Sequence, residues 1–262
     1  MSSSSRAAAL VLALVAVACV DDDPAPVARR ASPAPTPTST MAFAVPACPN
    51  HDAVALDEGL RSGGVLTGDV TGDGSDDQVS IRIDPEGEPE CESFLVVESG
   101  NSVTIGPIEG IGEEGGLTDP SLNSLAGIDG VNGLEVVINE AAGASTQFVG
   151  VFTIEEDGFE RVRIKGGEPE LWTGATQGLF PFGGSVGHIE AVDCTRAGIV
   201  VTSGVPAEGR RAMERGIYAI TRHVLEPEGA RLEAVDFVRS RVPIDELAES
   251  FPEFETSPFG SC

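Results

Sequence analysis

The chain has 262 residues, and its 42 acidic residues against 16 lysines and arginines give a formal net charge of −26 at pH 7. A surface this acidic repels nucleic acid phosphates and anionic lipid headgroups, which excludes both as partners, and it attracts cations such as calcium. The three histidines, His51, His188 and His223, are scattered along the sequence, which argues against a histidine-based metal site.

The first 19 residues predict an export signal. Arg6 precedes an apolar run at 7–18, which is too short to span a bilayer as a helix. The run ends in the sequence AVAC at 16–19, which resembles the bacterial lipobox. This resemblance implies that Cys19 is lipidated and becomes the new N-terminus, and it predicts anchoring to the cell membrane on the side facing outside the cytoplasm. An ordinary cleaved signal with an incidental cysteine is the alternative.

Residues 20–46 predict a disordered tether. The segment is rich in proline, alanine, serine and threonine and has no hydrophobic period, so it cannot bury enough apolar surface to fold. A largely extended segment of this length reaches on the order of 80 Å, at about 3.1 Å per residue. Signal, lipid site and tether together predict a globular domain, residues 47–262, held away from a membrane surface.

The predicted domain keeps an even number of cysteines if Cys19 carries lipid. An even number in an exported chain suggests two disulfides, and four cysteines allow three connectivities. We favour Cys48–Cys91 and Cys194–Cys262, because each bond would then tie one end of the domain. The chain has no Cys-x-x-Cys pair, so a zinc ribbon or a thioredoxin-like motif is not expected.

The segment from Gly68 to Asp77 predicts a calcium-binding loop. Oxygen-bearing side chains occupy loop positions 1, 3, 5 and 9, a backbone carbonyl is expected from Ser75, and two glycines let the loop curl tightly. Residues 78–83 follow directly and alternate like a strand, unlike the helix that follows an EF-hand loop. Because crowded carboxylates need a counter-ion, the loop predicts one structural calcium ion. The predicted ligands are Asp69, Thr71, Asp73, Ser75 and Asp77.

Three units of similar make-up divide the predicted domain. Each opens with a Gly/Asp turn, and Asp69, Asp129 and Asp193 place these turns 60 and 64 residues apart. Runs that read as short strands follow each turn. They lie at 78–83, 94–98, 103–108, 136–138, 148–154, 159–164, 199–201, 217–221 and 232–238. Residues 244–249 are the only helical candidate. Four short strands per unit are typical of a propeller blade.

These units predict an all-β fold, a small propeller-like assembly of about three four-stranded blades. Three blades are fewer than the four that usually close a propeller, so a β-sandwich is the alternative. The loop at 69–77 with its strand resembles the FG-GAP/VCBS repeat of integrin-like propellers and exported bacterial proteins. The Phe-Gly pair at 182–183 and the apolar strand at 199–201 support the resemblance, which covers 62–83 well, 182–206 less well and 126–138 weakly.

The resemblance implies a calcium-binding loop and blades used for recognition. It assigns the metal to the first turn alone, because Val131 stands where the second turn needs an aspartate and Arg196 and Ala197 replace ligands in the third. We therefore expect a non-catalytic binding or scaffold module in the cell envelope. Its ligand would be an envelope protein or a glycan, and nucleic acid is not expected.

A serine hydrolase is the alternative function. Residues 183–187 match G-x-S-x-G, with Ser185 as nucleophile. His188 or His223 would be the base, and Asp193 or Asp236 its partner. This motif needs a helix after the serine, whereas the sequence continues as a second strand-like stretch. The non-catalytic interpretation is therefore preferred.

Overall fold

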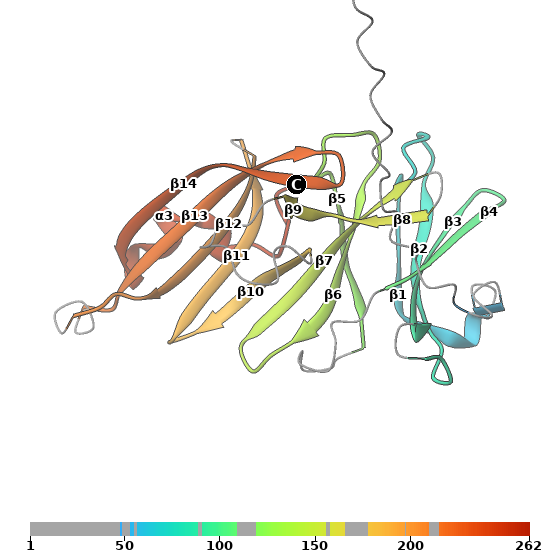
Figure 1. Cartoon of the computed structure of the whole chain (residues 1–262), viewed down its shortest axis with the longest axis horizontal. Helices are drawn as coiled ribbons and strands as arrows, with labels where there is room; N and C mark the ends of the chain where they lie inside the picture. Colours follow the sequence, from blue (N-terminus) through green and yellow to red (C-terminus); the bar gives the residue numbers. More distant parts are fainter. Residues whose placement is uncertain are drawn as a thin grey trace, which may run out of the picture. The chain divides into compact units, whose positions relative to one another are not determined.

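Most of the described chain consists of strands, which are almost all antiparallel (Figure 1). The computed structural model describes residues 48, 53–54, 57–88, 91–108, 119–155, 158–165, 178–196, 198–209 and 215–262. The predicted signal peptide, Cys19 and the tether at 20–46 lie outside these residues. All described residues belong to one unit, Ala44–Cys262. In this part of the chain, no helix has the length and apolar character needed to span a membrane.

The strands form two sheets. The first sheet follows the short helix η1 (Glu58–Leu60) and is a meander in the order β1-β2-β3-β4. Its strands are β1 (Arg61–Gly68), β2 (Asp77–Ile83), β3 (Ser93–Ser99) and β4 (Ser102–Pro107). The second sheet has ten strands in the order β5-β6-β7-β10-β11-β12-β13-β14-β9, and β8 pairs with β7. These strands are β5 (Ser121–Ala126), β6 (Glu135–Ala142), β7 (Thr146–Glu155), β8 (Gly158–Arg161), β9 (Arg163–Lys165), β10 (Leu179–Ser185), β11 (His188–Thr195), β12 (Gly198–Pro206), β13 (Ile217–Glu228) and β14 (Arg231–Pro243).

Strand β6 is buried on both of its faces. Val136 and Ile138 pack in one apolar cluster with Ile81 of the first sheet. Val137, whose side chain points the opposite way, packs in a second cluster with Val201 of β12. Burial on both faces explains why this strand is a continuous apolar run instead of an alternating one.

The structure confirms the all-β prediction and most of the predicted strands. The first unit forms its own four-stranded sheet, as expected for one blade. The next two units do not form separate blades, because Leu179–Gly183 of β10 pairs with Thr146–Gly150 of β7 and joins them into one sheet. The described strands do not close into a propeller, and the sandwich alternative fits the two sheets as well.

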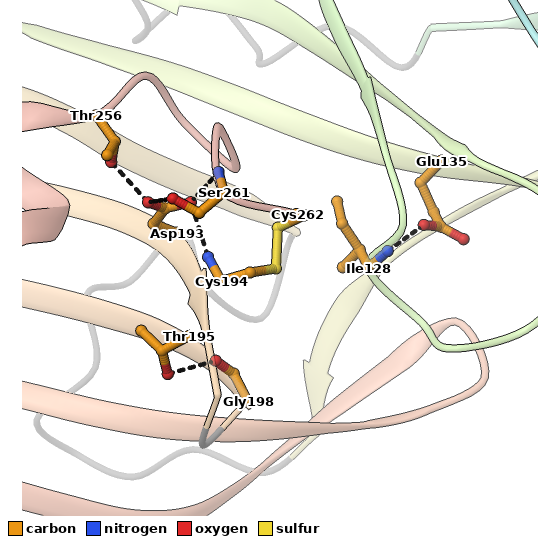
Figure 2. Close-up of a disulfide and its surroundings, with 9 residues drawn as sticks. All are labelled: Ile128, Glu135, Asp193, Cys194, Thr195, Gly198, Thr256, Ser261 and Cys262. Atoms are coloured by element: carbon orange, nitrogen blue, oxygen red, sulfur yellow. Dashed lines mark hydrogen bonds between the residues drawn. A yellow bond between two sulfur atoms is a disulfide. The ribbon is translucent and has the colours of Figure 1, made fainter.

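Both predicted disulfides are present. Cys48–Cys91 ties the segment N-terminal to the first sheet to the residues just before β3, and it packs with Phe94 and Val96. Cys194–Cys262 ties β11 to the last residue of the chain (Figure 2).

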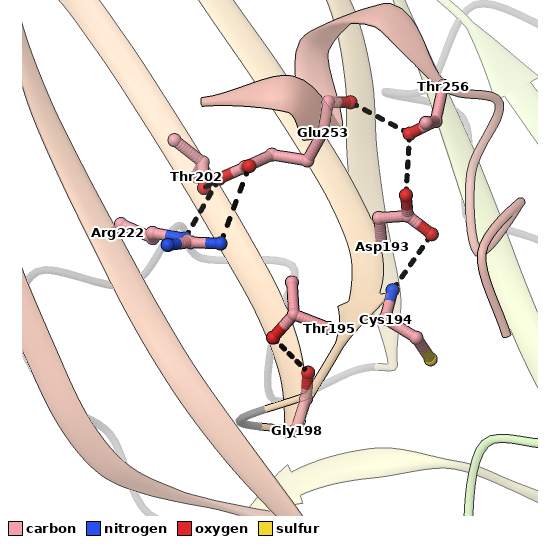
Figure 3. A network of polar contacts seen from close by, with 8 residues as sticks. All are labelled: Asp193, Cys194, Thr195, Gly198, Thr202, Arg222, Glu253 and Thr256. Atoms are coloured by element: carbon pink, nitrogen blue, oxygen red, sulfur yellow. Dashed lines mark hydrogen bonds and ion pairs between the residues drawn. The ribbon is translucent and has the colours of Figure 1, made fainter. Parts of the chain in front are cut away.

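The C-terminal segment lies against the second sheet. It contains η4 (Ile244–Glu246), α3 (Leu247–Ser250) and η5 (Pro252–Glu255), which confirms the predicted helical candidate. Phe251 packs with Tyr218, Ile220 and Val242 of the last two strands. The buried Glu253 side chain reaches the sheet, where it accepts a 2.6 Å hydrogen bond from Thr202 and pairs with Arg222 at 2.9 Å (Figure 3).

Candidate functional site

The acidic loop between β1 and β2 is organised around Asp77. Asp77 opens β2, is fully buried, and pairs with Gly68 at the end of β1. Its Oδ2 atom accepts three hydrogen bonds of 3.0 Å, from Val70 N, Thr71 N and Thr71 Oγ1. Burial alone would raise the pKa of Asp77, but hydrogen bonding by the Ser99 hydroxyl, together with the bonds from Thr71 and Val70, outweighs it and holds the pKa below its ordinary value. The buried group is therefore a carboxylate near neutral pH.

The remainder of the loop curls through local hydrogen bonds. Asp69 Oδ2 accepts a 2.9 Å bond from Gly74 N, and Asp73 Oδ1 accepts a 2.7 Å bond from Ser75 N. Gly74 has a φ of 86°, a left-handed conformation that glycine adopts without strain. Gly74 is the sixth loop residue, where a calcium loop of the EF-hand type also makes its sharp turn.

Two carboxylate oxygens of the loop are buried without a hydrogen bond. Oδ1 of Asp69 and Oδ1 of Asp77 accept no hydrogen bond of normal geometry. The Ser99 hydroxyl is nevertheless close enough to Asp77 to lower its pKa. An unpaired buried carboxylate oxygen is costly, and a bound cation is one way to satisfy it. A cation bound at the loop would satisfy these oxygens.

The structure brings only part of the predicted ligand set together. Thr71 and Asp77 are joined by a hydrogen bond, whereas the Asp73 side chain is exposed and bonded to Ser75. Among the described residues, no three or more His, Cys, Asp or Glu side chains form a group arranged to hold a metal ion. Calcium binding by the full set of five residues stays a prediction.

The second turn has the same construction as the first. Ala126 at the end of β5 pairs with Glu135 at the start of β6, as Gly68 pairs with Asp77. The Glu135 side chain accepts a hydrogen bond from the backbone of Ile128, seven residues earlier, just as Asp77 accepts one from Val70, also seven residues earlier. The two loops are thus equal in length.

This equivalence corrects the 60-residue spacing counted from Asp69 to Asp129. Residues 77 and 135 are 58 apart, as are residues 70 and 128, so Asp129 corresponds to Thr71 and not to Asp69. The residue equivalent to Asp69 is Gly127. An apolar residue followed seven positions later by a strand-opening acid is the signal that would have found the correct phase.

The two loops contact each other directly. Leu134 N donates a 2.8 Å hydrogen bond to the carbonyl of Asp69. A Cβ atom on Gly72 would lie 2.6 Å from the carbonyl oxygen of Asn132, so only glycine permits this approach. The predicted calcium loop thereby links the first sheet to the second.

The third turn is not a loop of this kind. Strands β11 and β12 are joined tightly, with Thr195 Oγ1 donating to the carbonyl of Gly198 (Figure 2). Asp193 lies within β11, where its carboxylate accepts hydrogen bonds from Thr256 and from both the backbone and the hydroxyl of Ser261. The third aspartate therefore holds the C-terminal segment in place and has no counterpart in the first two turns.

The residues of the hydrolase alternative are only partly brought together. Ser185 and His188 close the hairpin between β10 and β11, with Ser185 Oγ 3.4 Å from His188 Nδ1. A strand follows the serine, so the nucleophile elbow is not formed. The predicted partner Asp193 is bonded to the C-terminal segment, and Asp236 Oδ1 accepts the backbone N–H of Phe237.

The other predicted base lies elsewhere on the sheet. His223 is buried in β13 and stacks on Phe237, with 6.0 Å between ring centroids. Two polar residues near His188 were missed by the sequence analysis, namely Thr146 and Glu190. Thr146 Oγ1 lies 2.6 Å from His188 Nε2. No local pattern signals this contact, because it depends on the pairing of β7 with β10.

Comparisons with known protein families, curated proteins and solved structures found no match to this chain. The resemblance to FG-GAP/VCBS repeats thus rests on the loop sequence and its strand. It stays a prediction, together with the calcium site and the lipid anchor.

Proposed function

We propose that this chain is a lipid-anchored cell-envelope protein whose β-repeat domain is stabilised by calcium and serves as a non-catalytic binding or scaffold module. The observation that carries the proposal is the pair of buried carboxylate oxygens on Asp69 and Asp77 that accept no hydrogen bond. A divalent cation would satisfy both. Because Asp69 also bonds to Leu134 in the second loop, an ion there would stabilise the junction between the sheets.

The five predicted ligands differ in burial and in the type of oxygen atom that they would supply. Asp77 would supply a buried carboxylate and Asp69 a partly buried one. Thr71 and Ser75 would supply oxygen atoms from the loop, and Asp73 an exposed carboxylate at the loop surface. A site with this mixture of ligands should bind calcium weakly, with a Kd of about 10⁻⁴–10⁻³ M as in extracellular modules. Such an affinity suits a structural ion in an exported protein.

The test is thermal unfolding of residues 20–262, with disulfides formed, in 10 mM calcium and in excess EDTA. With a Kd of about 0.1 mM, calcium would add about 2.7 kcal/mol to the free energy of unfolding. For a domain of this size, that is an increase in Tm of roughly 5–10 °C. Asp73→Ala should abolish the increase, because it removes a ligand whose side chain is exposed and supports little else.

Asp76→Ala is the matched control. Asp76 is exposed, lies in the same loop, and is not at a ligand position, so this variant should keep the full calcium response. Equal Tm values in calcium and EDTA for the wild-type chain would refute the calcium site. Equal loss of the response in both variants would show a general charge effect instead of ligation.

The binding role is tested separately. The exported chain, immobilised through its C-terminus, would be incubated with detergent-solubilised envelope extract and with envelope polysaccharide. Recovery of one component that a Gly72→Val variant fails to retain would support a recognition role that depends on the junction of the two loops. Recovery of nothing above a tag-only control would contradict it.

A further inference from the structure

The C-terminal part of strand β14 is an edge of the second sheet. β14 follows β13 in the order of that sheet, and β9 pairs only with Arg231–Glu233 of β14. Among the residues that the structure describes, no further strand pairs with residues 234–243 (Figure 1). An edge strand presents backbone N–H and C=O groups with which a strand of another chain can pair.

The strand register shows which backbone groups of this edge point outward. Just past the strand, Ile244 N donates a 3.0 Å hydrogen bond to the carbonyl of Gly216, which precedes β13. In an antiparallel ladder, residue pairs that exchange backbone hydrogen bonds alternate with pairs that do not. Counted back from Ile244, the residues Phe237, Arg239 and Arg241 belong to pairs that do not. Their backbone N–H and C=O groups are therefore directed away from β13.

Apolar side chains along this edge are exposed on both faces of the sheet. Val235, Phe237 and Val238 are 49%, 52% and 47% exposed. Successive side chains of a strand point to opposite faces, so Phe237 and Val238 flank the edge on its two sides. The Phe237 ring stacks on buried His223, which holds it in place. A strand added to this edge would cover apolar surface on both faces.

The local charge of the edge is opposite to that of the whole chain. Arg239 and Arg241 are exposed and share one face of the strand. Asp236 is the only acidic residue between positions 234 and 243, and its Oδ1 atom accepts the backbone N–H of Phe237 at 2.8 Å. At physiological ionic strength, exposed charges more than about 8 Å apart are largely screened. The two arginines, and not the net charge of −26, therefore decide which side chains this edge attracts.

We infer that the edge of β14 binds an extended acidic segment of a partner protein, which joins the second sheet as an additional antiparallel strand. The backbone of the segment pairs with Arg239 and Arg241, and hydrogen bonds of this kind supply the affinity in strand addition. Two acidic side chains at alternate positions of the segment lie opposite the two arginines. Apolar side chains beside them cover Val238 and Phe237. The inference rests on the binding role proposed above and names the chemistry of the partner.

A second copy of the chain fits this edge less well than an acidic partner. In an antiparallel pair, the outward-directed residues of one strand lie opposite the outward-directed residues of the other. Arg239 and Arg241 of both copies would then lie together on one face of the joined sheet. Like charges across neighbouring strands are destabilising, so the edge favours a partner of opposite charge.

The experiment measures the binding of a fluorescein-labelled peptide, Thr-Glu-Val-Glu-Val-Tyr-Thr amide, to residues 20–262 by fluorescence anisotropy. In the antiparallel register, its glutamates lie opposite Arg241 and Arg239 and its tyrosine lies opposite Phe237. A peptide with glutamine at both glutamate positions should bind roughly 3- to 10-fold more weakly, the range for losing two exposed cross-strand ion pairs.

Variants of the chain test the two arginines directly. The double variant Arg239→Gln, Arg241→Gln should bind the glutamate peptide as weakly as the wild type binds the glutamine peptide. It should also no longer distinguish the two peptides. Arg231→Gln is the matched control, because Arg231 is exposed on the same strand but lies where β9 already pairs with it. This control should keep the full preference for the glutamate peptide.

Two N-methylated peptides test the strand pairing itself. The N–H of the second glutamate faces Arg239 across the expected ladder, whereas the N–H of the valine before it points to solvent. Methylation at the glutamate should weaken binding at least about 5-fold, as expected for losing one hydrogen bond. Methylation at the valine should leave the affinity almost unchanged. Equal affinities of the two methylated peptides would overturn the inference.

Other occupants of the edge give different results. A chain that is dimeric in sedimentation equilibrium and does not bind the peptide would overturn the inference in favour of a second copy. Displacement of the peptide by polygalacturonate, with no effect of N-methylation, would overturn it in favour of charge attraction alone. Failure of the peptide while the chain still recovers an envelope component would refute the edge site and leave the proposed binding role intact. Failure of that recovery with the peptide still bound would contradict the binding role instead.

Discussion

Asp77 and Glu135 hold the same place in two successive loops, yet their pKa values are shifted in opposite directions. Both open a strand, and both accept a backbone hydrogen bond from the residue seven positions earlier. Asp77 faces the Thr71 hydroxyl, which donates to it and helps to lower its pKa. Glu135 faces Asp129 at the equivalent position, and burial followed by this second carboxyl raises its pKa to about 7.

The raised pKa of Glu135 predicts that this group makes the fold less stable as pH rises. Between pH 4.5 and about 7 the folded chain keeps a proton that the unfolded chain has released. Protonation of Glu135 therefore contributes fully to the free energy of unfolding below pH 4.5, and this contribution is lost by about pH 7. The change is roughly 3 kcal/mol, at 1.36 kcal/mol per pKa unit. Urea unfolding at pH 4.5, 6 and 7.5 measures this change in the free energy of unfolding. In Glu135→Gln, the free energy of unfolding should vary less with pH over the same range.

Asp129→Thr tests whether the Asp129 carboxyl helps to raise the pKa of Glu135. The substitution places in the second loop the residue that the first loop has at Thr71, so a hydroxyl replaces the facing carboxyl. We expect the pKa of Glu135 to fall and the chain to gain stability at pH 7 relative to pH 5. A profile identical to that of the wild type would show that burial alone raises the pKa.

A glycine in β7 makes room for a buried ion pair. Arg161 contacts Glu140 through two hydrogen bonds of 2.6 and 3.0 Å, and both side chains are buried. A Cβ atom on Gly150 would lie 1.6 Å from Glu140 Oε1 and 2.7 Å from Arg161 Nη1. Gly150→Ala should therefore separate the pair and lower the free energy of unfolding by about 3–5 kcal/mol.

Gly127→Ala is the control for this prediction. Gly127 has open space around its Cβ position and no left-handed φ, so the same change of residue should be almost neutral. Urea denaturation at constant pH and calcium concentration compares the two variants. If Gly150→Ala were as stable as Gly127→Ala, the inference that the ion pair packs closely against β7 would be refuted.

The sequence predicted the features that local patterns determine. Strand alternation, the curled loop at 69–77 and the placement of cysteines near the domain ends led to the correct fold class and both disulfides. The predicted spacing of 60 residues matched Asp129 with Asp69 by residue type, whereas the acids that open the strands are 58 residues apart. At this spacing Val131 corresponds to Asp73, the aspartate position that the sequence analysis assigned to it. The contact of Thr146 with His188 was out of reach, since it depends on which strands pair across a long connection.

The Cys194–Cys262 bond should stabilise the domain mainly through the unfolded chain. It closes a separation of 68 residues, for which the chain-entropy relation gives about 4 kcal/mol. A Cys194→Ala, Cys262→Ala double variant should lose close to this amount in urea denaturation. It should keep the native fold, because Asp193 still holds Ser261 and Thr256 by hydrogen bonds (Figure 2). A variant that is unfolded in the absence of urea would contradict this expectation.

The C-terminal segment depends on the buried charge of Glu253. Its side chain is 1% exposed and pairs with Arg222, which is 25% exposed (Figure 3). Removing one partner of a fully buried pair costs about 3–5 kcal/mol, and the partial hydration of Arg222 reduces this to about 2–3 kcal/mol for Glu253→Gln. Glu255→Gln, at an exposed position of the same short helix, should be neutral.

A double-mutant cycle separates the pair from the packing around it. Arg222→Met removes the positive charge, so Glu253→Gln should cost less in that background than in the wild type, with a coupling of at least 1 kcal/mol. Amide hydrogen exchange in residues 251–262 should agree with these stabilities. Exchange should be accelerated more by Glu253→Gln in the wild-type background than by Glu253→Gln in the Arg222→Met background. Strict additivity of the two substitutions would mean that Thr202 and the apolar contacts of Phe251, not the ion pair, hold the segment on the sheet.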